Sequence, residues 1–104
     1  MSLTLLGLMR RANAIEPGQD KAMAAVKTGK AKMLILPADA TERAERNAAF
    51  ATEGRRIKVL KVPYTNEEIS HAIGIGGCTM LAITDKGFAG AFEKSLNKNR
   101  EGEE

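Results

Sequence analysis

The segment formed by residues 17–36 limits the possible folds of this 104-residue chain more than any other. Pro17-Gly18 breaks the preceding structure, and Gln19-Asp20 supplies side-chain oxygens that we expect to cap the free N–H groups of a helix start. Apolar residues at helical spacing follow, and Gly29 stands where a helix end favours a residue that tolerates positive φ. Residues 33–36 (MLIL) form an apolar run with the length of a central strand. The segment therefore predicts a turn, a short helix, a glycine stop and a buried strand.

Four lysines surround this predicted unit: Lys21, Lys27, Lys30 and Lys32. A helix N-terminus that exposes backbone amides beside several lysines can hold a phosphate group. The alternative is that the lysines only solvate the outer face of the helix and the ends of the strand, which is the commoner role of surface lysines. Both interpretations are compatible with the charge of this segment.

The other segments alternate between helix and strand signals and predict an α/β domain, with helices on both faces of a small central sheet. Helices are expected over residues 2–13 and 41–52, after a capping box at residues 65–68, and after a capping aspartate at residue 85; short strands are expected at residues 14–16, 57–62 and 79–84. The domain is expected to cover residues 1–96. Residues 97–104 (NKNREGEE) contain no apolar side chain, so we expect a disordered tail there.

The composition is typical of one globular domain, with 43% hydrophobic and 28% charged residues. There is no Trp and there are only three Phe and one Tyr, so large stacking platforms for bases are not expected. The single cysteine, Cys78, excludes an internal disulfide and any multi-cysteine metal site, and a reducing cytoplasm is the simplest location. The apolar N-terminal segment is followed, not preceded, by its positive charges and is too short to cross a membrane, so neither a signal peptide nor a membrane partner is expected.

The basic side chains are concentrated in two parts of the sequence. The net charge is +3 overall, but residues 1–36 and residues 55–62 each carry +4, whereas residues 37–54 carry −2 and residues 63–85 carry −3. This distribution favours a polyanion-binding surface on one side of the molecule over uniform basicity.

Candidate catalytic residues are few. His71 is the only histidine, and its place in the last turn of a predicted helix favours a capping or merely exposed role. Cys78 has no histidine placed beside it by the sequence, and the glycine-rich residues 74–77 precede a strand, whereas a phosphate-binding P-loop precedes a helix. We therefore expect no enzyme, and neither a cofactor nor a metal site.

Several segments together resemble a known family: LLGLMRRAN, then PGQDKAMAAVKTGKAKMLILPADAT, then HAIG and LAITDKGFA. In this order they are similar to the small YlxQ-type relatives of the kink-turn-binding ribosomal proteins (the L-seven-Ae, L-thirty-e and Gadd-forty-five superfamily), and the resemblance covers residues 3–92. It implies a three-layer α/β/α sandwich with a mixed sheet of about four strands. It also implies that the partner is structured RNA, ribosomal RNA or the ribosome, and not DNA.

The resemblance also implies where the RNA is bound. In the family, the start of the second helix and the loop before the last strand face the RNA. The corresponding residues here are Gly18, Gln19, Asp20, Lys21, Ile75, Gly76, Gly77 and Cys78, and we add the nearby lysines Lys27, Lys30 and Lys32. Helix amides and polar side chains would contact the bent RNA backbone, and the glycine-rich loop would pack against an unstacked nucleotide.

The chain departs from the motif of the strong kink-turn binders, Gly-x-Asn-Glu-x-x-Lys. Asp20 replaces the asparagine, Lys21 replaces a glutamate that would accept a hydrogen bond from a guanine edge, and Ala24 replaces the lysine. Two hypotheses follow. The chain binds structured RNA with altered or weakened kink-turn recognition, or the fold serves as a non-catalytic protein-interaction module.

Overall fold

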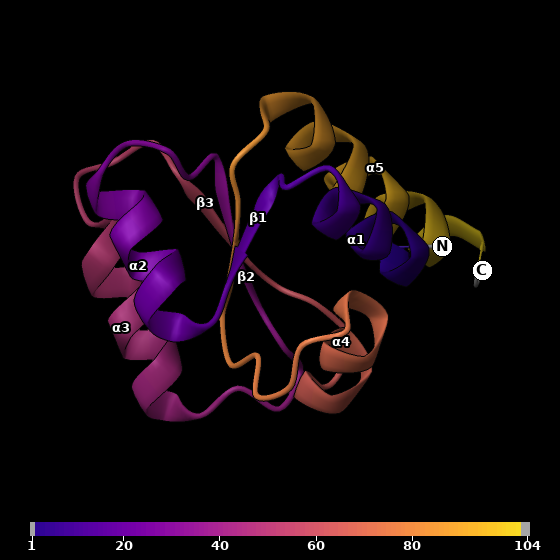
Figure 1. Ribbon diagram of the computed structural model, residues 1–104, viewed down its shortest axis with the longest axis horizontal. Coiled ribbons are helices and arrows are strands. Elements are labelled where there is room, and N and C mark those ends of the chain that lie inside the picture. The colour runs from indigo at the N-terminus through magenta and orange to yellow at the C-terminus, as the bar shows by residue number, and fades with distance from the viewer. Residues whose placement is uncertain (1, 103–104) are drawn as a thin grey trace.

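The computed structural model describes residues 2–102, and the side chains of residues 2–97. Within these residues, five helices and four strands alternate (Figure 1). They are α1 (Ser2–Arg11), β1 (Ile15–Pro17), α2 (Gln19–Lys27), β2 (Met33–Leu36), α3 (Glu42–Thr52), β3 (Lys58–Lys61), α4 (Asn66–Ile73), β4 (Leu81–Ile83) and α5 (Lys86–Gly102). None of the described helices is long and apolar enough to cross a membrane.

The four strands form one mixed sheet in the order β1-β4-β2-β3. The last strand of the chain, β4, lies between β1 and β2 and is antiparallel to both, whereas β2 and β3 are parallel. Consequently β1, β2 and β3 end at the same end of the sheet at which β4 begins. We call this the glycine end, since Gly18 follows β1 and residues 74–80 precede β4 there. The opposite end is called the basic end and carries residues 27–32 and 53–57. In Figure 1 the glycine end is at the bottom and the basic end is at the upper left.

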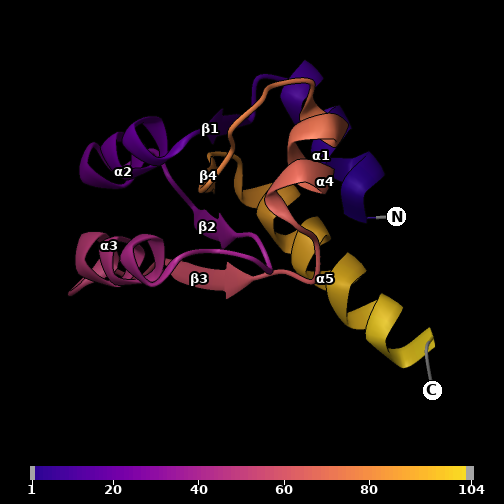
Figure 2. The same ribbon diagram turned by 90° about the horizontal axis from the view of Figure 1, so that it is seen from below.

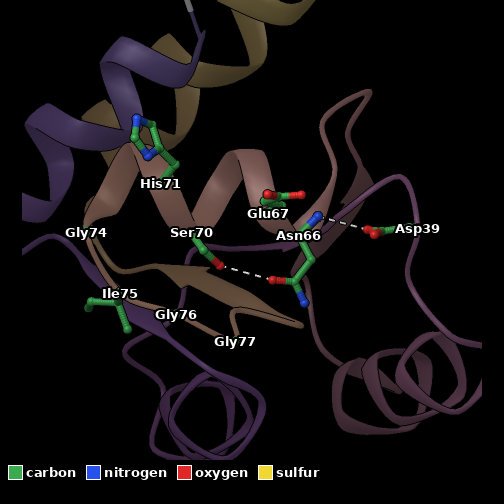
Figure 3. Close-up of a pocket in the computed structure, with 9 residues that line it drawn as sticks. All are labelled: Asp39, Asn66, Glu67, Ser70, His71, Gly74, Ile75, Gly76 and Gly77. Atoms are coloured by element: carbon green, nitrogen blue, oxygen red, sulfur yellow. Dashed lines mark hydrogen bonds between the residues drawn. The ribbon is translucent and has the colours of Figure 1, made fainter.

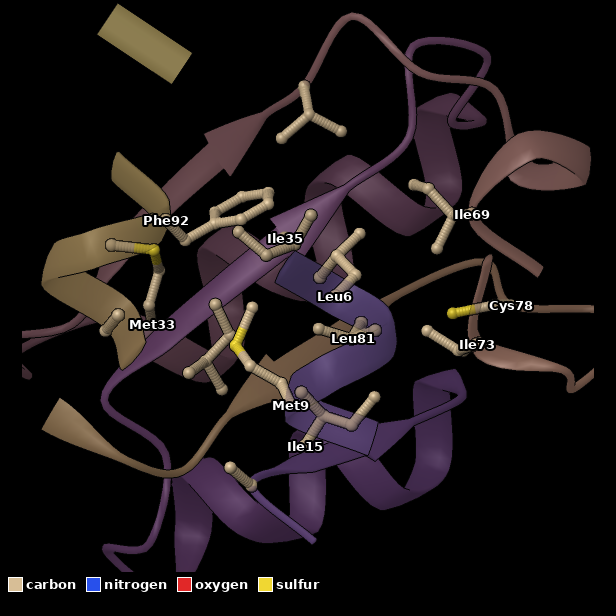
Figure 4. Close-up of a cluster of buried hydrophobic side chains, with 14 residues drawn as sticks. Leu6, Met9, Ile15, Met33, Ile35, Ile69, Ile73, Cys78, Leu81 and Phe92 are labelled. Carbon is tan, nitrogen blue, oxygen red and sulfur yellow. The ribbon is translucent and has the colours of Figure 1, made fainter. Parts of the chain in front are cut away.

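The helices cover the sheet on both faces, which gives three layers (Figure 2). On one face α1, α4 and α5 enclose the larger core cluster, in which Leu6 and Phe92 are fully buried against Ile35 and Leu81 (Figure 4). On the other face α2 and α3 contribute mainly alanines, and these pack against the alternate strand residues Leu34, Leu36 and Ala82. The expected three-layer α/β architecture with a small mixed sheet is confirmed.

Local capping signals set most of the helix starts. The Thr41 hydroxyl accepts a hydrogen bond from Ala44 N at 3.1 Å, and the Asp85 carboxylate accepts one from Phe88 N at 2.9 Å. At α4 the capping box is complete, since Thr65 Oγ1 accepts from Glu68 N and Glu68 Oε1 accepts from Thr65 N. These predictions from the sequence are confirmed because each depends on neighbouring residues only.

The end of the chain differs from the expectation. Helix α5 continues to Gly102, whereas we expected residues 97–104 to form a disordered tail. The segment lacks apolar residues but contains helix-favouring residue types, and a helix that has already begun extends at little cost. Glu103 and Glu104 lie outside the described residues.

Candidate functional site

A backbone hydrogen bond joins the two glycine-framed segments at the glycine end. Gly18 N donates to Met80 O at 2.7 Å, so the start of α2 lies against the loop that precedes β4. Gly18 has φ 101° and ψ 147°, a backbone conformation that L-residues with a side chain rarely adopt. A Cβ at this position would nevertheless meet no atom within 4 Å. The backbone angle, not lack of space, therefore requires glycine at the turn into α2.

The start of α2 has no side-chain cap. Gly18 occupies the N-cap position, so the prediction that Gln19 and Asp20 cap this helix is wrong, and the Asp20 side chain is exposed. The first N–H groups of a helix have no partner within the helix and carry its partial positive charge. At α2 no side chain satisfies the amides at the cap, so they remain available to an acceptor from outside the protein.

Hydrogen bonds from α4 hold the glycine-rich loop in place (Figure 3). The Ser70 hydroxyl donates to Asn66 Oδ1 at 3.0 Å and accepts from Cys78 N at 3.2 Å. Asn66 N in turn donates to Asp39 Oδ1 at 2.8 Å, which links the loop after β2 to the start of α4. Gly76 and Gly77 are exposed between these anchors, and Ile75 is half-buried against the larger core cluster.

Cys78 anchors the loop from inside. Its side chain is buried, and Cys78 Sγ lies 3.5 Å from Met80 O. Burial raises the pKa of the Cys78 thiol, and backbone hydrogen bonds from Gly18 and Met80 oppose this shift. The thiol is therefore protonated near neutral pH and faces the core, so of the predicted loop residues Cys78 does not present its side chain to a ligand.

The glycine end is not basic. Lys21 is its exposed lysine on α2, and Asp20 is exposed directly beside it. A shallow depression next to the glycine-rich loop is lined by Asp39, Glu67 and His71, together with Asn66, Ser70 and the loop backbone (Figure 3). This depression was not predicted from the sequence, although the capping box at residues 65–68 marks the helix that forms one side of it.

The remaining predicted lysines lie at the basic end. Lys27 closes α2, a helix of nine residues or about 13 Å, and Lys30 and Lys32 lead into β2. Lys32 N donates to Ile83 O at 2.7 Å, and Ile83 is the last residue of β4. The structure therefore brings residues 18–21 together with residues 75–78, but it places these three lysines at the other end of the sheet. The expectation that they lie beside the start of α2 is wrong, because the helix carries them away from it.

Among the described side chains, no three His, Cys, Asp or Glu residues gather in a way that could hold a metal ion.

The chain is similar to known proteins, although no protein-family model matches it. It is 29% identical over 89 residues to the RNA-binding protein YlxQ of Bacillus subtilis (strain 168), and the match covers 82% of this chain and 84% of that protein. The structure resembles that of a protein with unknown function from Bacillus halodurans C, with a TM-score of 0.85, 25% identity, and 92% and 96% of the two chains covered. It also has the fold of the 15.5kD RNA binding protein of Giardia lamblia, with a TM-score of 0.72, 20% identity, and 92% and 82% coverage.

Proposed function

Since the chain is a YlxQ-type relative, we propose that it binds structured RNA through the glycine end, and that it has no catalytic activity. The contacts would come from residues 18–21 at the start of α2 and from residues 75–78 in the loop before β4. The resemblance to ribosomal proteins supports ribosomal RNA or the ribosome as the partner, and a cytoplasmic role in translation.

The observation that carries this proposal is the hydrogen bond from Gly18 N to Met80 O. It holds the uncapped amides of α2 next to the exposed backbone of Gly76 and Gly77, on one end of a rigid sheet. Amides at a helix start bind phosphate oxygens, and a glycine-rich backbone allows the close approach of a nucleotide. The buried side chain of Cys78 supports this arrangement through packing.

The side chains at the start of α2 favour altered recognition over that of a strong kink-turn binder. Asp20 and Lys21 are both exposed in the first turn, so the charge that Lys21 offers to phosphate is opposed by the neighbouring carboxylate. Ala24, also exposed, offers no cation where the strong binders have lysine. We expect the glycine end to make few phosphate contacts and to discriminate weakly between a kink-turn and a straight duplex.

One observation favours the protein-interaction module as a second candidate function. The depression beside the glycine-rich loop is bordered by the carboxylates of Asp39 and Glu67, which repel phosphate but suit a basic segment of a protein. Co-purification with ribosomal particles that survives both nuclease treatment and high salt would support this alternative.

The proposal is tested by adding a negative charge to the loop. Gly76 has no positive φ, and a Cβ there would meet no atom within 4 Å, so Gly76→Glu is compatible with the fold. We expect it to weaken binding of a kink-turn hairpin RNA roughly fivefold at 0.1 M salt, the effect of losing one phosphate contact. The matched control is Gly90→Glu, at another exposed glycine with open space, on α5.

Binding would be measured for the full chain by fluorescence anisotropy, with a straight duplex of the same length as the second probe. Equal affinities of Gly76→Glu and Gly90→Glu for the hairpin would contradict a contact at the glycine end. An absence of binding to both probes at low salt would contradict the proposed function as a whole.

A further inference from the structure

Parts of the two basic stretches of the sequence lie together at the basic end. Strands β2 and β3 are parallel neighbours with Met33 opposite Lys58, so the residues that lead into them lie side by side. The incoming segments are residues 27–32 and residues 53–57, and each follows the C-terminus of a helix, α2 or α3 (Figure 1). Adjacent strands are about 4.8 Å apart, so the two segments enter the sheet next to each other, at the same end.

The cations on the surface of the basic end are exposed and form no ion pair among the described side chains. Its basic residues are Lys27, Lys30, Lys32, Arg55 and Arg56, and all five are exposed. The ion pairs formed among the described side chains are Lys58–Glu93 and Lys61–Glu45, so none of the five takes part in one. The backbone beneath them is fixed, since Lys30 N donates to Ala25 O at 2.9 Å and Arg55 N donates to Thr52 O at 3.0 Å.

A purely structural role does not account for so much charge. Cations stabilise helix C-termini, each of which is equivalent to about half a negative charge. Two helices, α2 and α3, have their C-termini at the basic end. Residues 27–32 and 53–57 contain three lysines, two arginines and one glutamate, a net charge of +4. The two helix ends would therefore leave most of this charge uncompensated.

An exposed aromatic side chain adjoins the same surface. Phe50 lies in the last turn of α3, is 77% exposed, and stands three positions before the basic segment 53–57. Leu8, the other exposed large hydrophobic residue among the described side chains, is 49% exposed and lies on α1. An exposed aromatic ring on a basic surface is an arrangement that can stack on nucleic-acid bases.

We propose that the basic end is a second RNA-binding surface, which contacts the phosphates of a single-stranded RNA segment with its five cations and stacks one base on Phe50. This goes beyond the proposed function, since it assigns RNA binding to the end of the sheet opposite the glycine end and depends on none of residues 18–21 or 75–78. The molecule measures 35 × 27 × 26 Å, so different parts of one folded RNA reach both ends.

Two charge variants test the phosphate contacts on the full chain. Arg55→Ala/Arg56→Ala and Lys30→Ala/Lys32→Ala each remove two cations of the surface, and Arg43→Ala/Lys94→Ala, which removes two exposed cations elsewhere, is the matched control. The probe is a 12-nucleotide uridine oligomer, titrated between 50 and 200 mM salt. Each surface variant is expected to lower affinity roughly 25-fold at 0.1 M salt and to reduce the log–log salt slope by about 1.4, whereas the control changes both far less.

Phe50→Ala tests the stacking contact, with Leu8→Ala as its control. We expect Phe50→Ala to lower affinity for the uridine oligomer roughly fivefold or more with an unchanged salt slope, and Leu8→Ala to leave it unaltered. Circular dichroism at the binding temperature establishes that each variant is folded.

The outcomes separate this proposal from the preceding one. Losses in the surface variants no larger than in Arg43→Ala/Lys94→Ala, or no binding of the oligomer by the unmodified chain, would overturn the second surface. Gly76→Glu is expected to leave binding of the single-stranded oligomer unaltered. The hairpin RNA therefore tests the glycine end, and the uridine oligomer tests the basic end separately.

Discussion

Cys78 illustrates how one buried side chain stabilises a loop whose exposed residues carry no packing of their own. The thiol lies against Met80 O, and the backbone of Gly18 approaches it from the start of α2. Gly76 and Gly77, the two residues directly before Cys78, are exposed. The position of the loop thus depends on a residue whose side chain is buried. The Cys78 thiol therefore contributes packing and not contacts with a ligand.

The raised pKa of Cys78 predicts a pH dependence of stability. In the unfolded chain the thiol ionises near its ordinary pKa of 9.0, whereas burial raises the pKa in the folded state. The folded state therefore retains the proton that the unfolded state releases, so this contribution to stability is fully present below pH 9 and is lost as pH rises through the folded pKa. Urea unfolding at several pH values should show a steeper loss for the unmodified protein than for Cys78→Ala, and parallel curves would contradict the assignment.

Helix α4 positions the glycine end, since the Ser70 hydroxyl accepts from Cys78 N in the glycine-rich loop and Asn66 N donates to Asp39 Oδ1 in the loop after β2. Its own start depends on the reciprocal hydrogen bonds of Thr65 and Glu68. A change at the cap is therefore expected to affect the loop at the other end of the helix.

Thr65→Ala should destabilise the protein by about 1 kcal/mol, because it removes the acceptor for Glu68 N at 3.1 Å. Chemical denaturation measures the effect. The control is Thr4→Ala, at an exposed position in α1 that makes no cap, and its free energy of unfolding should change by less than about 0.5 kcal/mol. Equal effects of the two substitutions would show that the capping box contributes nothing.

At the level of elements, sequence reasoning succeeds where the signal is local. Thr41, Thr65 and Asp85 identify their helices because a cap involves residues three positions apart. The prediction of a cap at Asp20 fails, because Gly18 occupies the cap position, and the Gly18 N–H bonds Met80 O, 62 positions later in the chain. Such a long-range partner has no signature in the neighbouring sequence.

At the level of the whole molecule, strand direction decides which residues share a surface. The sequence predicts both basic segments and both glycine-framed segments, and it correctly leads to an α/β fold. The sequence does not show where Lys30 and Lys32 lie relative to Gly18. Their position depends on the direction of two elements: α2 leads from the glycine end to the basic end, and β2 leads back to the glycine end. The two charge signals are therefore visible in the sequence, but their meeting point is set by topology.

The separation of the two ends predicts independent effects on binding. A strand of four residues spans about 13 Å, beyond the range in which substitutions usually interact. For an RNA that carries both a kink-turn hairpin and a single-stranded tail, the losses in binding free energy of Gly76→Glu and Arg55→Ala/Arg56→Ala should add within about 0.5 kcal/mol. Anisotropy titrations of the single and combined variants measure this, and strong non-additivity would contradict separate contact surfaces.

The central position of β4 has a consequence for biosynthesis. Residues 81–83 are the last of the four described strands to be made, yet among these strands β1 pairs only with them, and Gly18 has no Met80 to bond until this part of the nascent chain has emerged. The β2–β3 pair can form earlier, whereas the first strand must wait for a neighbour from near the end of the chain. The sheet is therefore completed late, and a prematurely terminated product that stops before residue 80 would lack the junction at the start of α2.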